Sequence, residues 1–235
     1  MGGIINKLEL FHGDCLDVLP KLIGEGVTVD LIIIDPPYLM NYYSKCRKDR
    51  SHDFCKTILN DDNASVITDV LPLLYSILKE GGAFYCFCNS NHIDFFKSEI
   101  SKYFNYRNIL VWVKNNHTGG DIRTTYAKKT EFIVYASKGR HELYGRRDTD
   151  VLFYDKIVGK RQLHQNQKPV DLLEFLIGKS SEKNEIILDC FMGSGSTGVA
   201  CHNMGREFIG VELDENYYNI AVERLKENDV QKKLI

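Results

Sequence analysis

The chain has 235 residues, of which 43% are hydrophobic and 26% charged, and its formal net charge is −2. These values exclude a disordered tail, a collagen-like fibre and a disulfide-framework peptide, and they fit one domain with a sizeable core. The chain has no apolar run near the ~18 residues of a membrane span and no signal-peptide pattern, and its seven cysteines are scattered. We therefore expect a cytoplasmic protein that has reduced thiols and does not enter a membrane.

The first strong pattern is Val29–Ile34, a β-branched and almost wholly apolar run that is typical of a strand buried on both faces. Apolar residues at helical spacing predict helices at 64–80, 93–104, 171–177, 197–204 and 214–226, the last with Asp214 as its N-cap. Further strands are predicted at 83–88, 109–114, 131–136, 185–189 and 207–211. Because strands and helices alternate, we expect an α/β domain with a mostly parallel sheet.

Two long segments without a predicted helix or strand, 41–62 and 115–127, are candidates for functional loops. Positive charge is concentrated in residues 121–161, which hold ten Lys and Arg against six Asp and Glu. A smaller basic cluster lies between Lys45 and Arg50. Such stretches are either solvated loops or a cationic surface that faces phosphates, and charge alone leaves both interpretations open.

A glycine-rich turn, DCFMGSGST at residues 189–197, follows the strand predicted at 185–189. Glycines let the backbone turn sharply and approach a ligand closely, and the helix that follows presents unpaired N–H groups. One strand later, Glu212 stands at a strand end, where an acid binds ribose hydroxyls in doubly wound folds. The turn lacks the lysine of a phosphate-binding loop. The alternative interpretation is a helix-entry turn beside a surface glutamate.

A second motif, Asp35-Pro36-Pro37-Tyr38, follows the most hydrophobic strand, at the end where ligands bind in open α/β sheets. The two prolines stiffen the turn, so the Asp35 carboxylate, the Pro36 carbonyl and the Tyr38 ring project from a rigid support. Two acceptors and an aromatic ring suit a planar heterocycle that bears an amino group. An ordinary strand-terminating turn is the alternative.

Four segments together resemble one family: DPPY at 35–38, HQNQKP at 164–169, DCFMGSGST at 189–197 and GVELDENYYNIAVERL at 210–225. With Gly13-Asp14-Cys15 ahead of the first predicted strand, they are similar to S-adenosylmethionine-dependent DNA methyltransferases that act on adenine N6 or cytosine N4. The catalytic motif precedes the cofactor motif, which is the circularly permuted order that the family calls β. The resemblance spans residues 1–235, and it implies one Rossmann-like methyltransferase domain with helices on both faces of a mixed, mostly parallel sheet.

The resemblance also implies roles for single residues. The motif from Asp35 through Pro36 and Pro37 to Tyr38 would hold a base flipped out of double-stranded DNA, for direct in-line attack of its amino group on the methyl donor. The residues expected to bind S-adenosylmethionine are Asp14, Lys168, Pro169, Asp189, Phe191, Gly193, Ser194, Gly195, Thr197 and Glu212.

DNA contacts are expected from two basic segments, 41–62 and about 138–163. Their candidate residues are Lys45, Arg47, Lys48, Arg140, Arg146, Arg147, Lys160 and Arg161. The second segment is short, which predicts a short or relaxed target site. The compact chain also leaves room for a homodimer.

Adenine N6 is the expected target and cytosine N4 the alternative, because N4 enzymes of the family more often have Ser in place of Asp35. Methylation of a cytosine ring carbon is excluded, since it needs a Pro-Cys dipeptide and no proline here precedes a cysteine. A methyltransferase for RNA or protein amines and a binding module without catalysis stay open. No metal is expected, because Cys46, His52 and Cys55 lack paired spacing and a fourth ligand.

Overall fold

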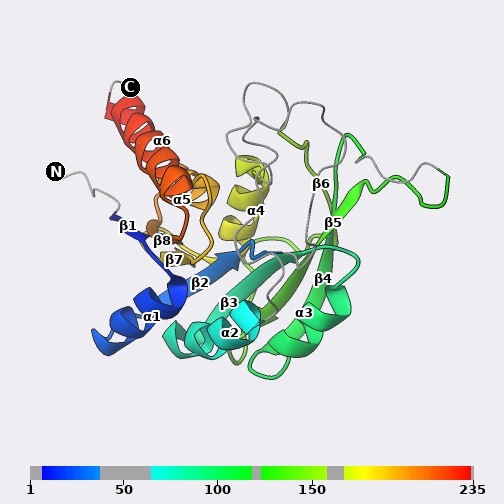
Figure 1. The fold of residues 1–235 in the computed structure, drawn as a ribbon, viewed down its shortest axis with the longest axis horizontal. Coiled ribbons are helices and arrows are strands. Elements are labelled where there is room, and N and C mark those ends of the chain that lie inside the picture. The colour runs from blue at the N-terminus through cyan, green and yellow to red at the C-terminus, as the bar shows by residue number, and fades with distance from the viewer. Residues whose placement is uncertain (1–6, 38–64, 118–122, 158–166, 234–235) are drawn as a thin grey trace.

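The computed structural model describes residues 7–37, 65–117, 123–157 and 167–233, with side chains as far as residue 227. Figure 1 shows the arrangement of the helices and strands. The order along the chain is β1 (Leu8–His12), α1 (Cys15–Gly24), β2 (Val29–Ile34), α2 (Ser65–Ile77), β3 (Leu78–Cys88), α3 (Ile93–Ile100), β4 (Asn105–Val113), β5 (Thr130–Ser137), β6 (Val151–Phe153), α4 (Val170–Ser180), β7 (Ile186–Asp189), α5 (Ser196–Met204), β8 (Glu207–Glu212) and α6 (Glu215–Lys233).

The eight strands of the described residues form one sheet in the order β1-β8-β7-β2-β3-β5-β4-β6. Strands β1, β8, β7, β2 and β3 are parallel, whereas β5 runs antiparallel between β3 and β4, and β6 is parallel to β4. Every strand except β5 therefore ends at the same edge of the sheet, where β5 begins. We call this edge the carboxyl edge and the opposite one the amino edge.

Helices cover both faces of the sheet, which confirms the predicted α/β class (Figure 1). In the central strand β2, Ile32 and Ile34 belong to the core that includes α1, α2 and α3, whereas Leu31 and Ile33 belong to the core that includes α4, α5 and α6. All four side chains are at most 1% exposed. A strand with two buried faces needs an apolar residue at almost every position, and this accounts for its sequence.

Several parts of the chain differ from the sequence prediction, including the unpredicted strand β6 and the helix expected at 93–104, which ends at Ile100. β1 and α1 precede Val29, so the turn at residues 13–15 lies between them rather than ahead of the first strand. The predicted helix at 64–80 ends earlier, at Ile77, because the chain then pairs with β2 through Val29↔Leu78. Lys79 also forms an ion pair of 2.6 Å with Asp30 of β2. Sheet pairing thus takes over residues whose local pattern continues the helix.

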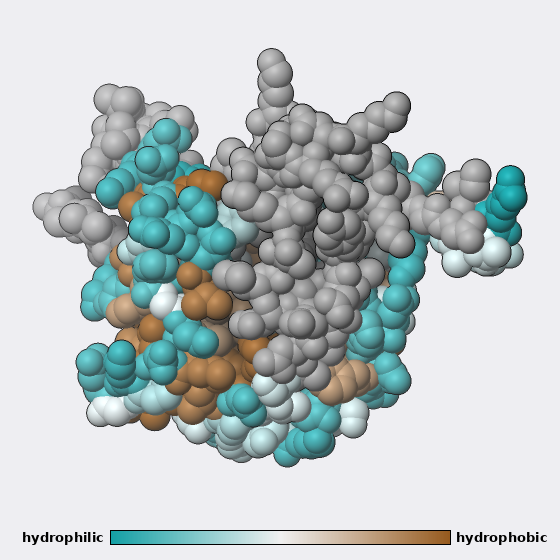
Figure 2. Space-filling view, in the orientation of Figure 1, coloured by the Kyte–Doolittle hydropathy of each residue, from teal (hydrophilic) through white to brown (hydrophobic). Residues whose placement is uncertain are grey.

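The surface seen in this view is of mixed polarity (Figure 2). Hydrophobic residues gather on its left half, and the right-hand margin is hydrophilic. Among the helices of the described residues, none is both long and apolar enough to cross a membrane. Polarity alone does not identify a binding surface here, so the site is located from the strand ends.

Candidate active site

Asp35, Pro36 and Pro37 follow β2 directly, at the carboxyl edge of the sheet. Pairing of β2 with β7, through Leu31↔Ile187 and Ile32↔Leu188, puts the end of β2 beside the end of β7. The glycine-rich turn begins at that end of β7. The two motifs that the sequence singled out, 154 residues apart when counted from Asp35 to Asp189, therefore lie at adjacent strand ends.

The glycine-rich turn is held by hydrogen bonds to Asp189. Its Oδ2 accepts the Thr197 hydroxyl at 2.6 Å, and its Oδ1 accepts the Phe191 N–H at 3.1 Å. Gly195 has φ +75°, in the left-handed region that favours glycine, and it begins α5. A Cβ at this position would lie 3.0 Å from the Cβ of Ala221 in α6. Both the backbone conformation and the packing therefore require glycine there.

Helix α6 supports the same turn from the other side. Arg224 donates hydrogen bonds to the Ser194 carbonyl at 3.1 Å and to the Ser196 hydroxyl at 3.0 Å. Ser194 and Thr197 are buried, and the Thr197 hydroxyl is used by Asp189. Their buried side chains therefore stabilise the conformation of the turn. Sequence reasoning missed Arg224, for which no local pattern signals this role.

Two further acids follow neighbouring strands at this edge. Glu212 ends β8, and its two oxygens accept the N–H groups of Gly193 and Asp214, each at 2.8 Å. Asp14 follows β1 and caps α1 by accepting the Leu16 N–H at 2.9 Å. Carboxylate oxygens have more than one lone pair each, so both acids can also accept hydrogen bonds from a ligand.

Near the ends of β7 and β8, Asp189 is buried and Glu212 is half-buried, and neighbouring negative charges repel Asp189. Burial raises the pKa of Asp189 to about 7, and the negative charges of Asp35 and Glu212 add to this rise. Burial also raises the pKa of Glu212. A ligand that brings positive charge and hydroxyl groups would relieve this repulsion.

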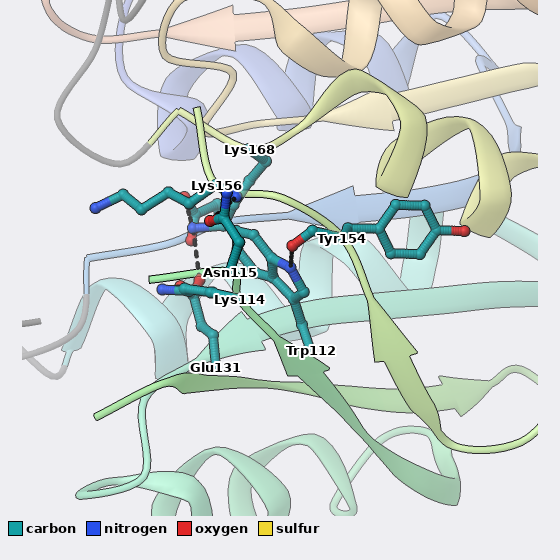
Figure 3. Close-up of polar contacts among 8 residues, drawn as sticks. Trp112, Lys114, Asn115, Glu131, Tyr154, Lys156 and Lys168 are labelled. Atoms are coloured by element: carbon teal, nitrogen blue, oxygen red, sulfur yellow. Dashed lines mark hydrogen bonds and ion pairs between the residues drawn. The ribbon is translucent and has the colours of Figure 1, made fainter. Parts of the chain in front are cut away.

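On the other side of Asp35, the ammonium group of Lys168 lies between two carboxylates (Figure 3). Its Nζ donates to Asp35 Oδ2 at 2.6 Å and lies 2.7 Å from Glu131 Oε1. Glu131 Oε2 in turn accepts a hydrogen bond from Lys114 Nζ at 2.6 Å. These contacts form a row of alternating charges that starts at Asp35 and ends at Lys114.

Burial and pairing act against each other on the groups of this row. Burial by itself favours the neutral forms, but the ammonium groups of Lys168 and Lys114 lower the pKa of Glu131 to about 2. The carboxylates of Asp35 and Glu131 likewise raise the pKa of Lys168 above its ordinary value, against the effect of burial. Both groups are therefore charged at neutral pH.

The expected role of Lys168 in cofactor binding stays a prediction. Its ammonium group is bound by Asp35 and Glu131. Pro169 is the N-cap residue of α4. Sequence reasoning missed Glu131 and Lys114, which come together because β4 and β5 pair with Trp112 opposite Glu131. A single acid at the start of an otherwise apolar strand was the available signal.

The expected DNA-contacting residues are only partly brought to this site. His141, next to Arg140, contacts the Gly81 carbonyl near the start of β3, and the Arg146 carbonyl accepts from Lys179 near the end of α4. Both arginines therefore lie at the amino edge, away from Asp35, and the exposed Arg147 follows Arg146. Tyr38, Lys45, Arg47, Lys48, Lys160 and Arg161 lie outside the described residues.

A sequence profile of the DNA methylase family N6_N4_Mtase matches residues 29–223, which include Asp35, Lys168 and the glycine-rich turn. This chain belongs to the N6/N4 DNA methylase family. The methylase is 33% identical over 225 residues to the YubD protein of Escherichia coli strain K12, covering 92% of this chain and 89% of YubD.

Two further relatives extend the comparison. The methylase is 25% identical over 250 residues to the DNA adenine methyltransferase YhdJ of Escherichia coli strain K12, covering 92% of this chain and 82% of YhdJ. Its structure resembles that of M1.HpyAVI in complex with S-adenosylmethionine, with a TM-score of 0.75 and 26% identity over 93% of this chain and 98% of that one. The expected fold, enzyme class and cofactor are thus confirmed.

The residues at the carboxyl edge fit S-adenosylmethionine. The buried carboxyl group of Asp189, with its raised pKa, suits a ligand that carries a positive sulfur. Glu212 stands where a ribose would bind, and the turn around Gly195 brings backbone close to that space. The ends of β7 and β8 are therefore the candidate cofactor side, and the charged row lies on the other side of Asp35.

Proposed function

We propose that this methylase transfers a methyl group from S-adenosylmethionine to the N6 amino group of adenine in double-stranded DNA. The observation that carries the proposal is the position of Asp35 and Asp189 at adjacent strand ends of one sheet edge. The acid at position 35 and the similarity to YhdJ, a DNA adenine methyltransferase, support adenine as the target base. The amino group is inaccessible inside a duplex, so the base must flip out, at a cost of a few kcal/mol.

Asp35 and Pro36 activate the amino group of the base. An exocyclic amine is a poor nucleophile because its lone pair is delocalised into the ring. Hydrogen bonds from its two N–H groups to the Asp35 carboxylate and the Pro36 carbonyl favour a pyramidal nitrogen with a localised lone pair. The carboxylate also stabilises the positive charge that develops on this nitrogen until its proton leaves, and alignment supplies a further part of the acceleration.

The remaining residues of the site bind the two substrates. When bound, S-adenosylmethionine supplies an electrophilic methyl group on a positively charged sulfur. Asp189 and the turn from Phe191 to Gly195 hold its methionine and ribose part, Glu212 holds the ribose hydroxyls, and Asp14 contacts its adenine. Pro37 stiffens the catalytic corner, and stacking of the flipped base on Tyr38 offsets roughly 1–3 kcal/mol of the flipping cost.

The DNA faces the carboxyl edge of a single catalytic domain. Segment 41–62 follows the catalytic corner in the chain, and Lys156 of segment 138–163 lies at this edge, where its N–H donates to Asn115 Oδ1 at 3.2 Å. Burial, with the charge of Lys114, lowers the pKa of Lys156. The exposed Lys128 and Lys129 lie just ahead of β5 at the same edge. A homodimer and a cytoplasmic location remain predictions from the sequence.

Replacement of Asp35 tests the function directly. We expect Asp35→Asn to lower methyl transfer to duplex DNA by about 100-fold or more, because the carboxylate is aimed at the charge that develops. Asp30→Asn is the matched control: Asp30 stands at the other end of β2 and pairs with Lys79 at the same 2.6 Å. Methyl transfer is measured with labelled S-adenosylmethionine, and mass spectrometry identifies the methylated base.

Each outcome has a definite meaning. N6-methyladenine that disappears in Asp35→Asn but not in Asp30→Asn supports the proposal. N4-methylcytosine as the product would replace adenine by the alternative target. Transfer to RNA or protein with none to DNA, or Asp35→Asn activity within tenfold of the unaltered protein, would contradict it.

A further inference from the structure

The side chains of the charged row beside Asp35 are buried, although burying charged groups does little to stabilise a fold. The side chains of Lys168, Glu131 and Lys114 are 6%, 10% and 10% exposed. Lys168 Nζ lies 4.9 Å from the centre of the Phe87 ring, and Lys114 Nζ lies 4.7 Å from that of Trp112. Taking charges out of water costs several kcal/mol per ion, so such rows contribute little net stability.

The position of the row gives it a catalytic meaning. It lies at the carboxyl edge, where β4 ends and β5 begins, and its first contact is to Asp35, which follows β2. Lys168 reaches Asp35 from 133 residues away along the chain. Glu131 contacts both Lys168 and Lys114. Its effect on Asp35 therefore passes through Lys168, and that of Lys114 passes through Glu131.

We propose that Lys168 is a positioning residue that fixes the Asp35 carboxylate in place and in its charged form, and that Glu131 and Lys114 hold Lys168 for this task. This inference rests on the proposed function of Asp35 and extends it to residues outside the DPPY motif. A charged carboxylate can accept the N–H of the base and stabilise a positive nitrogen, whereas a protonated one presents an O–H and has no charge.

Other groups also face Asp35, and they set the background for its titration. Within the described part of the chain, Lys168 ahead of α4, Cys86 and Cys88 of β3, and Asp189 of β7 interact electrostatically with Asp35. Four more charged groups lie at the same edge: Glu131 of β5, Lys114 after β4, Lys156 after β6 and Glu212 of β8. Lys168 forms an ion pair of 2.6 Å with Asp35, so its removal should change the titration of Asp35 strongly.

Two substitutions should move the titration of Asp35 in opposite directions. Lys168→Met removes the adjacent positive charge, so we expect the pKa of Asp35 to rise by about 1 unit or more. Glu131→Gln removes the negative charge of a second carboxylate that pairs with Lys168, so the pKa of Asp35 should fall. A merely structural role of either residue would not produce opposite shifts.

The measurement is carbon NMR of protein labelled at its aspartate carboxyl groups, with the Asp35 signal assigned by its absence in Asp35→Asn. Turnover is measured in parallel, and affinity for S-adenosylmethionine is measured by calorimetry. We expect Lys168→Met to lower kcat by about 100-fold with little change in cofactor affinity, and Lys168→Arg to restore most of it. Lys79→Met, which removes an ion pair of equal length at the amino edge, is the matched control.

The titration does not depend on turnover, so the inference and the proposed function fail separately. An unchanged Asp35 signal in Lys168→Met and Glu131→Gln, or shifts of the same sign, would overturn the inference. Loss of cofactor affinity in Lys168→Met without a shift of Asp35 would assign Lys168 to the cofactor instead. If Lys168→Met does not fold, two other variants still test the inference: Glu131→Gln should lower the pKa of Asp35, and Lys168→Arg should retain most of kcat.

Absence of methyl transfer by the unaltered protein would overturn the proposed function. The titration of Asp35 would still decide whether Lys168 pairs with it.

Discussion

At the scale of single residues, Asp189 links the stability of the fold to the binding of the cofactor. Its side chain is buried and bonded to Thr197 and Phe191, and its pKa is raised from 3.8 to about 7, chiefly by burial. A carboxyl group whose pKa is raised by folding binds its proton more tightly in the folded state. The stability of the ligand-free protein therefore falls as pH rises from about 4 to about 7 through this group.

Cofactor affinity should have the opposite pH dependence. A positively charged ligand favours ionised Asp189, so we expect the affinity for S-adenosylmethionine to increase as pH rises through about 7. Asp189→Asn should weaken binding by roughly tenfold and raise the free energy of unfolding of the ligand-free protein at pH 8 by on the order of 1 kcal/mol. Calorimetry and chemical denaturation at several pH values measure the two effects.

The substitution also serves as its own control for other titrating groups. In Asp189→Asn the pH dependence of binding that belongs to this carboxyl group disappears, while any dependence from the ligand remains. An equal pH dependence of cofactor affinity in both proteins would show that the charge of Asp189 does not affect cofactor binding.

At the scale of elements, helix α5 begins where the backbone is most restricted. Gly195 precedes it with positive φ, and a Cβ at Gly198 within it would lie 2.9 Å from the Phe208 ring of β8. The glycines therefore let α5 pack closely on its neighbours, and this packing fixes the turn that follows β7. Side chains at these positions would move the turn away from Glu212 and Asp189.

Gly195→Ala should damage both folding and binding. We expect it to lower the free energy of unfolding by about 1–3 kcal/mol, because the alanine is strained at this φ and crowds Ala221. Cofactor affinity should fall by roughly tenfold, since one misplaced loop loses several hydrogen bonds. Thermal unfolding with and without S-adenosylmethionine measures both losses.

A matched substitution separates strain from crowding. Gly26 has φ +79° and nothing within 4 Å of the Cβ that an alanine would add. Gly26→Ala should therefore show the conformational cost alone, about 1 kcal/mol, with unchanged cofactor affinity. Equal effects of the two substitutions on cofactor affinity would argue against a special role of the turn.

At the scale of the whole molecule, the sheet separates two sets of basic residues. Lys128 and Lys129 lie at the carboxyl edge with Asp35, whereas Arg140 and Arg146 lie at the amino edge. If a duplex delivers a base to Asp35, as we propose, we expect it to meet the first set. Basic charge in the sequence is continuous across both sets, so composition alone did not distinguish them.

Paired substitutions test which edge faces the duplex. We expect Lys128→Ala with Lys129→Ala to weaken DNA binding and to reduce the salt dependence of the binding constant by about 0.9 for each phosphate that the protein no longer neutralises. Arg140→Ala with Arg146→Ala removes the same charge and should leave both quantities unchanged. Fluorescence anisotropy at several salt concentrations measures them, and a larger effect of the arginine pair would place the DNA at the amino edge.

The sequence by itself determined the features that depend on neighbouring residues. The apolar run of β2 identified a central strand, Asp189 and its glycines identified the turn, and the two prolines identified the rigid corner after Ile34. Such patterns are local, because a strand, a tight turn or a cap is specified within a few residues. These features were sufficient to predict the α/β fold and both halves of the candidate site.

Only the tertiary structure decided what depends on strand order. It joined Lys168 to Asp35 across 133 residues, brought Lys114 to Glu131 and sent Arg146 to the opposite edge. It also ended α2 at Ile77, where pairing with β2 outweighs helical spacing. The reason is physical. The residues next to a side chain do not indicate its distant partner, because the order of strands in the sheet decides which strand ends meet.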